Sequence, residues 1–212
     1  MSMTRRTIGW LAASLLSFAA LGAQAQAGKA PEALIKEVST DVLEAVKADK
    51  TIQAGDLRKV IALVDQKVLP YVNFQRMTAS AVGRYWKQAT PDQQKRLQDE
   101  FKLLLVRTYS GALSQVSAEQ TVELRPMRSA PTDNEVVVRT EIKGKGDPIQ
   151  LDYRLEKAGD SWKIYDVNVL GVWLVENYRN SFAQEIGANG IDGLIAKMAE
   201  RNKSAAAAGA KS

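Results

Sequence analysis

The chain has 212 residues, 45% of them hydrophobic and 25% charged, which is enough apolar material for a core and argues against disorder. Its formal net charge is +5, but the basic residues are scattered and no basic run is interleaved with aromatic residues, so we expect no nucleic-acid partner. The chain has no cysteine and no histidine, which excludes disulfides, a Ser-His-Asp triad, a cysteine nucleophile and metal sites built on thiolate or imidazole.

Residues 1–25 are typical of a secretory signal peptide. Two arginines, Arg5 and Arg6, precede an apolar run over residues 8–21 that is too short for a typical membrane span. Cleavage is expected after Ala25 or Ala27, where the small-residue pattern fits. A buried N-terminal helix is the alternative interpretation. We expect an exported protein, with a bacterial periplasm as its natural location.

The first half of the mature chain has helical periodicity. An amphipathic helix is predicted over residues 31–47, where a valine or leucine recurs every four residues, and a second is predicted from Asp56 to Pro70. Asn73 can cap a third helix that includes Tyr85 and ends near Trp86. Thr90-Pro91-Asp92-Gln93 is a capping box that begins a long helix, predicted to end near residue 116.

The second half alternates apolar and polar residues at the period of a half-buried strand. Strands are predicted around residues 122–124, 136–143, 149–156 and 162–170, with turn residues between the last three. Gly171 then ends the last strand, and Val172 and Trp173 begin a helix that reaches Phe182. A loop over residues 187–190 separates it from a final helix, and residues 204–212 form a disordered tail.

These elements predict one α+β domain over residues 26–203. A curved antiparallel sheet of about four strands packs against N- and C-terminal helices. Such a sheet can close around a filled core or around an apolar cavity, and the pattern alone does not distinguish the two.

One acidic residue lies inside an apolar strand. Asp166 follows Tyr165 in the sequence IYDVNV, and burial there would raise its pKa and suit a general base. The alternative is a structural aspartate that is hydrogen-bonded to a neighbour or faces solvent. Glycine-rich phosphate loops are absent from the sequence.

Several motifs, in order along nearly the whole mature chain, resemble the Mla-type periplasmic phospholipid-binding proteins, the MlaC or toluene-tolerance family. They are VLPYVNF at 68–74, VGRYW at 82–86, LVRTY at 105–109, DYRL at 152–155, WKIYDV at 162–167, NYR at 177–179 and GIDGLI at 190–195. Asn73 stands where the family pattern has Asp, and Ser161 is an extra turn residue. The asparagine leaves the expected pocket unchanged, because both residue types cap helices.

The resemblance implies a fold related to the nuclear-transport-factor-2 type, with an apolar cavity that holds the acyl tails of a glycerophospholipid. It further implies a shuttle between an outer-membrane lipoprotein–porin complex and an inner-membrane ABC lipid transporter, which maintains outer-membrane lipid asymmetry. The phospholipid would be cargo, and we expect no cofactor, no metal and no enzymatic activity.

Combining that implied cavity with the periodicity gives a set of lipid-binding candidates. They are Val136, Val138, Ile142, Leu151, Tyr153 and Leu155 on strands, and Val82, Leu105, Tyr109, Leu113, Val172 and Trp173 on helices. Three other functions stay open: a carrier of another apolar lipid such as a hopanoid, an envelope enzyme that uses Asp166 and Tyr165, and an adaptor that binds only proteins.

Overall fold

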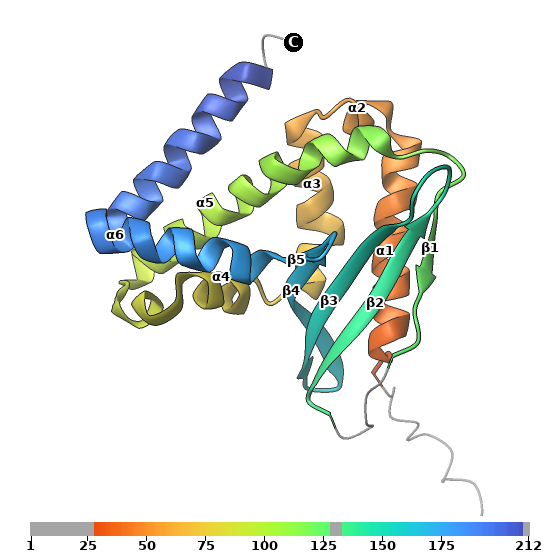
Figure 1. Ribbon diagram of the computed structural model, residues 1–212, viewed down its shortest axis with the longest axis horizontal. Coiled ribbons are helices and arrows are strands. Elements are labelled where there is room, and N and C mark those ends of the chain that lie inside the picture. The colour runs from red at the N-terminus through yellow and green to blue at the C-terminus, as the bar shows by residue number, and fades with distance from the viewer. Residues whose placement is uncertain (1–27, 128–132, 210–212) are drawn as a thin grey trace, which may run out of the picture.

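The computed structural model describes residues 28–127 and 133–209, so the predicted signal peptide lies outside the described residues. Helices come first, then a sheet, then a long C-terminal helix (Figure 1), which confirms the mixed helix and sheet class. The helices that precede the sheet are α1 (Pro31–Ala48), α2 (Lys50–Gln53), α3 (Leu57–Lys67), α4 (Phe74–Val82) and α5 (Pro91–Ser110), with the 3-10 helices η1 (Leu69–Tyr71), η2 (Gly83–Gln88) and η3 (Gly111–Gln115).

The sheet is antiparallel throughout, and its strands lie side by side in sequence order. The strands are β1 (Thr121–Leu124), β2 (Glu135–Lys143), β3 (Ile149–Ala158), β4 (Ser161–Val169) and β5 (Val172–Trp173). The first four confirm the predicted meander. The register between β3 and β4 shifts after Arg154, because Tyr165 is an extra residue on β4.

The fifth strand corrects the prediction that Val172 and Trp173 begin a helix. Leu170 and Gly171 both have positive φ, 51° and 90°, which is the backbone of a tight two-residue hairpin turn. This turn folds Val172 back onto Val169, and the helix begins only at Leu174. A leucine rarely adopts this conformation, so the sequence gives little warning of the turn.

Helix α1 runs behind the β1–β2 side of the sheet, as Figure 1 shows, and its N-terminal half covers one end of the inner face. Leu34, Ile35 and Val38 of α1 pack against a buried apolar group on the strands. That strand group consists of Val136, Val138, Leu155 and Ile164. This end of the sheet therefore has a filled core.

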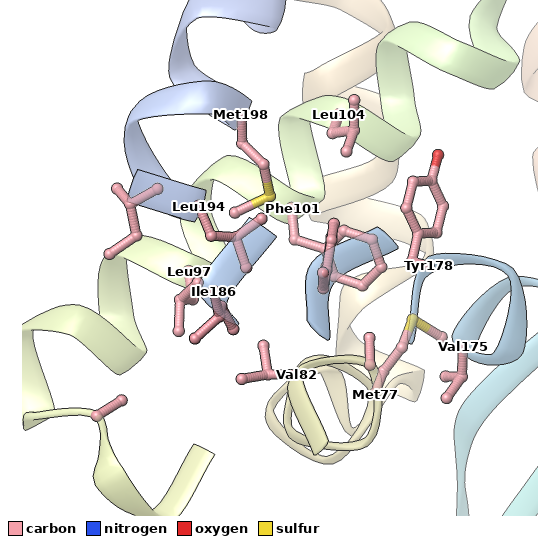
Figure 2. Close-up of a cluster of buried hydrophobic side chains, with 14 residues drawn as sticks. Met77, Val82, Leu97, Phe101, Leu104, Val175, Tyr178, Ile186, Leu194 and Met198 are labelled. Atoms are coloured by element: carbon pink, nitrogen blue, oxygen red, sulfur yellow. The ribbon is translucent and has the colours of Figure 1, made fainter. Parts of the chain in front are cut away.

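Helices α4, α5 and α6 (Leu174–Gly209) form a second core, shown in Figure 2. Phe101 lies at its centre with 0% exposure. Its ring contacts Tyr178 and Phe182 edge-on, at centroid distances of 5.1 and 5.3 Å. The cluster also includes Met77, Val82, Leu97, Leu104, Val175, Ile186, Leu194 and Met198. This core fixes the position of α5 relative to both neighbours.

Two helices end earlier than the periodicity predicts. Helix α4 ends at Val82, because Gly83 has φ 65° and ψ −136°, and Tyr85 lies in η2 instead. The capping box that begins α5 is confirmed by hydrogen bonds in both directions between Thr90 and Gln93. The helix ends at Ser110, and the chain continues to Gln115 as η3.

Helix α6 replaces the loop predicted over residues 187–190. Only Gly190 departs from helical backbone, with φ 73° and ψ 179°, and it kinks the helix there. The helix extends to Gly209, so it includes residues 204–209 of the predicted tail. No helix within residues 28–127 and 133–209 combines the length and the apolar character that spanning a bilayer requires.

Candidate functional site

An apolar cavity of about 380 Å³ lies between the helices and the sheet. Small-molecule sites usually have volumes of about 300–1,000 Å³. One side of the cavity is formed by α3, η1, α4, α5 and η3, through Val64, Val68, Leu69, Val72, Phe74, Met77, Lys102, Leu105, Val106, Tyr109, Ala112, Leu113, Gln115 and Val116. The other side is formed by Gln120, the strands β2 to β4 and the start of α6, through Ile142, Ile149, Leu151, Val167, Val169 and Leu174.

The longest wall runs along α5 and η3. Helical periodicity brings residues three and four positions apart to one face, so a single stripe follows the cavity. The stripe contains Lys102, Leu105, Val106, Tyr109, Ala112, Leu113 and Val116. Phe101 and Leu104, on the adjacent face of α5, point into the helical core instead.

The strand wall uses the end of the sheet that α1 leaves uncovered. Ile142 pairs with Ile149, and Leu151 pairs with Val169, close to the turn between β2 and β3. Their side chains share the inner face with the residues under α1, because side chains alternate between faces along a strand. The position of α1 therefore decides which part of that face is core and which part borders the cavity.

The lining is only half-buried at most positions, whereas core residues of the same elements are fully buried. Leu105 and Leu151 are intermediate in exposure, while Phe101 and Leu155 are 0% exposed. The difference arises because the cavity, rather than other side chains, lies against the lining residues.

The polar groups of the cavity are few. Among the described residues, the polar ones that line it are Lys102, Gln115 and Gln120 besides Tyr109. Burial raises the pKa of Tyr109, so its hydroxyl stays neutral at physiological pH. An environment of this kind suits alkyl chains, which need no hydrogen-bond partners.

Five of the twelve candidate residues line the cavity. They are Leu105, Tyr109, Leu113, Ile142 and Leu151. The structure thus brings together the candidates from α5 and η3 with those from the β2–β3 end of the sheet.

The other seven lie elsewhere. Val136, Val138 and Leu155 are in the core under α1, and Tyr153 packs against the same core with its hydroxyl 3.2 Å from Ser39 Oγ. Val82 is in the helical core, Val172 is 48% exposed on β5, and Trp173 stacks against the Arg154 guanidinium.

Sequence reasoning missed the wall formed by α3, η1 and β4. Val64, Val68 and Val72 recur every four residues, which is a signal for one helical face, and Val167 and Val169 alternate on a correctly predicted strand. These signals predict inward-facing residues but not what lies opposite them.

Asp166 lies on the outer side of the sheet and is not part of the cavity lining. Its carboxylate is 1% exposed and accepts hydrogen bonds from the backbone N–H groups of Val167 and Val175, at 2.9 and 3.1 Å. It also pairs with Arg154 at 3.0 Å. Val175 is in the first turn of α6, so Asp166 ties the start of that helix to β4. These contacts give the aspartate a structural role.

The pH dependence of stability should reveal this buried aspartate. Burial raises its pKa above the ordinary value of 3.8, although its hydrogen bonds and Arg154 oppose the shift. Above pH 3.8 the unfolded chain loses this proton before the folded chain does, so the contribution of Asp166 to stability falls as the pH rises through this window. The free energy of unfolding of the wild type, relative to Asp166→Asn, should therefore decrease from pH 3 to pH 6.

Urea unfolding across this pH range measures that difference, and Asp160→Asn, on the exposed β3–β4 turn, supplies the baseline for removal of a surface carboxylate. A wild-type advantage over Asp166→Asn that grows with pH would contradict the expected sign.

Tyr165 takes part in a separate surface cluster. Its hydroxyl donates to Glu135, and the Arg76 guanidinium lies 3.7 Å from its ring centroid. Across the described ranges, no group of three or more acidic residues is placed to hold a metal ion.

Comparisons with known proteins identify relatives of this chain. The family model described as "MlaC protein" matches residues 36–200. The intermembrane phospholipid transport system binding protein MlaC of Haemophilus influenzae is 26% identical over 79% of this chain and 80% of its own. The toluene tolerance protein ttg2D of Pseudomonas putida is 25% identical over 84% of this chain and 86% of its own.

A solved structure is similar over most of its length. The phospholipid-binding protein from Ralstonia solanacearum, determined in complex with a phospholipid, is 47% identical with a TM-score of 0.79. The match covers 82% of this chain and 98% of that one. Because the family model spans most of the sequence and the fold agrees, this chain belongs to the MlaC family.

Proposed function

We propose that this chain is a phospholipid-binding carrier of the Mla system, which holds the acyl tails of its cargo in the cavity between α5 and the sheet. The observation that carries the proposal is the cavity itself, whose lining is apolar on both sides. The family relationship and the phospholipid-bound relative support the same function.

The energetics explain why such a carrier needs a cavity and no catalytic group. Two acyl chains contain roughly 30 methylenes, and each costs about 0.8 kcal/mol to expose to water, so a free lipid would face a cost of order 20 kcal/mol. A carrier that matches the apolar interior of a bilayer removes most of this barrier and can still release its cargo.

The proposed setting is the periplasm. The carrier accepts lipid from an outer-membrane lipoprotein–porin complex and delivers it to an inner-membrane ABC transporter complex, which maintains the lipid asymmetry of the outer membrane. The name of the Haemophilus relative, which places that protein in an intermembrane phospholipid transport system, supports this path. The predicted signal peptide over residues 1–25 supports export.

Mass spectrometry of organic extracts tests the function directly. Protein purified from its own periplasm should release about one diacyl phospholipid per chain, with mixed head groups, because the lining is mostly apolar. A hopanoid in place of phospholipid would replace the proposed cargo. Folded protein that releases no lipid would contradict the carrier function and favour an adaptor.

A further inference from the structure

One charged side chain lies on the wall of this otherwise apolar cavity. In the part of the chain that the structure describes, Lys102 is the only charged residue among those that line it. Lys102 is on α5, one helical turn before Leu105, and its side chain is 24% exposed. The ammonium therefore lies where the wall meets solvent.

The position of the ammonium is set by a second helix. Lys102 Nζ donates a hydrogen bond of 2.9 Å to Asp65 Oδ1 on α3, and the Asp65 side chain is 42% exposed. The four-carbon stem of a lysine can follow an apolar wall while its charge reaches the rim. The pair thus marks a rim of the cavity between α3 and α5.

The remaining polar lining residues do not offer a comparable group. Gln115 and Gln120 are neutral amides, and both have local partners: Gln115 Nε2 donates to Ser114 Oγ, and Gln120 Oε1 accepts from the backbone N–H of Ser117. The Tyr109 hydroxyl is neutral as well. An anionic group on a bound lipid would therefore find its one cationic partner on the cavity wall at Lys102.

We infer that Lys102 binds the phosphate of the cargo lipid, exchanging its contact with Asp65 for one with the phosphodiester. An amphiphile whose tails fill the cavity has its phosphate where the tails end, at the rim. The Lys102–Asp65 pair is exposed and contributes little to stability, so it opposes the exchange only weakly, and the contact that replaces it is likewise a charge-assisted N–H···O bond. This inference rests on the proposed function and adds a selectivity for phospholipids over neutral lipids with the same tails.

A competition between two lipids tests the inference. Protein stripped of endogenous lipid is incubated with mixed micelles that contain equal amounts of phosphatidylglycerol and diacylglycerol with identical acyl chains, and the bound lipids are quantified by mass spectrometry. The wild type should prefer the phospholipid. Lys102→Met should lower this preference by about tenfold or more, as expected for a lost hydrogen bond to a charged group, while total bound lipid per folded chain stays the same.

Matched variants separate phosphate binding from general charge. Lys95→Met, on the same helix but outside the cavity lining and paired with Asp99, should keep the wild-type preference. Lys102→Arg should keep the preference too. Asp65→Asn should keep or increase the preference, because the ammonium no longer has to leave a carboxylate.

Phosphatidylethanolamine, whose head group carries no net charge, should show the same dependence on Lys102.

An unchanged preference in Lys102→Met would overturn the inference, as would an equal loss in Lys95→Met or an equal loss of both lipids in Lys102→Met. If the wild type binds neither lipid, the proposed function fails instead, so the two failures are distinguishable.

Discussion

Replacing Leu151 by glutamate is expected to remove bound phospholipid from the protein while leaving it folded. Leu151 lines the cavity on β3, and its side chain is half-buried because the cavity lies against it. An ionised carboxylate pressed against acyl chains has to lose its water, which costs several kcal/mol. Since 1.4 kcal/mol is a factor of ten in affinity, the affinity for the lipid should fall by about 100-fold or more.

The fold should survive because the lipid-free cavity can hydrate the new charge. Circular dichroism and urea unfolding check the fold, and mass spectrometry of extracts measures the lipid. Ala158→Glu is the control, since it introduces the same charge at an exposed position of β3 outside the cavity lining. Wild-type lipid content in folded Leu151→Glu would show that the strand wall is not part of the binding site.

The same substitution at Tyr153 illustrates what the sequence can and cannot predict. Leu151 and Tyr153 are two residues apart, so strand alternation places both on the inner face and makes both lipid-binding candidates. In the structure Tyr153 packs with the core beneath α1, next to Val138 and Ser39. A glutamate at position 153 should therefore disturb folding rather than lipid binding alone.

The physical reason is that periodicity depends only on residues close in the sequence. A cavity forms where no other element packs against an inward-facing surface, and that depends on distant parts of the chain. The period-2 and period-3.6 patterns predicted four strands and the main helices, because local alternation and capping determine them. Whether an inward face meets a helix or an empty volume depends on where α1 lies, and α1 is separated from the strands by more than 70 residues.

The turn at Leu170 shows a second limit. Left-handed backbone is normally a signal for glycine or asparagine, and at this turn a leucine takes it with φ 51°. The pairing of Val169 with Val172 stabilises the hairpin despite this cost. Tertiary context of this kind overrides local propensity, so the sequence pattern places the start of α6 too early.

The largest effect on stability is expected for Phe101→Ala, which should lower the free energy of unfolding by about 3–5 kcal/mol. Phe101 is 0% exposed, and its ring lies 5.1–5.9 Å, centroid to centroid, from the rings of Tyr178, Phe182 and Phe74. These partners come from α4 and α6, so truncation opens a void where three helices meet. Urea unfolding of lipid-free protein measures the loss.

Leu105→Ala is the informative comparison, because Leu105 is one turn further along α5 and faces the cavity. Its truncation enlarges an existing space instead of creating a new one, so the cost should be near the low end for leucine, about 2 kcal/mol. The loss of bound lipid per folded chain should be larger for Leu105→Ala, which removes contacts with the tails, than for Phe101→Ala, which keeps them. Equal losses of stability in the two variants would mean that the cavity wall of α5 is packed as tightly as its core face.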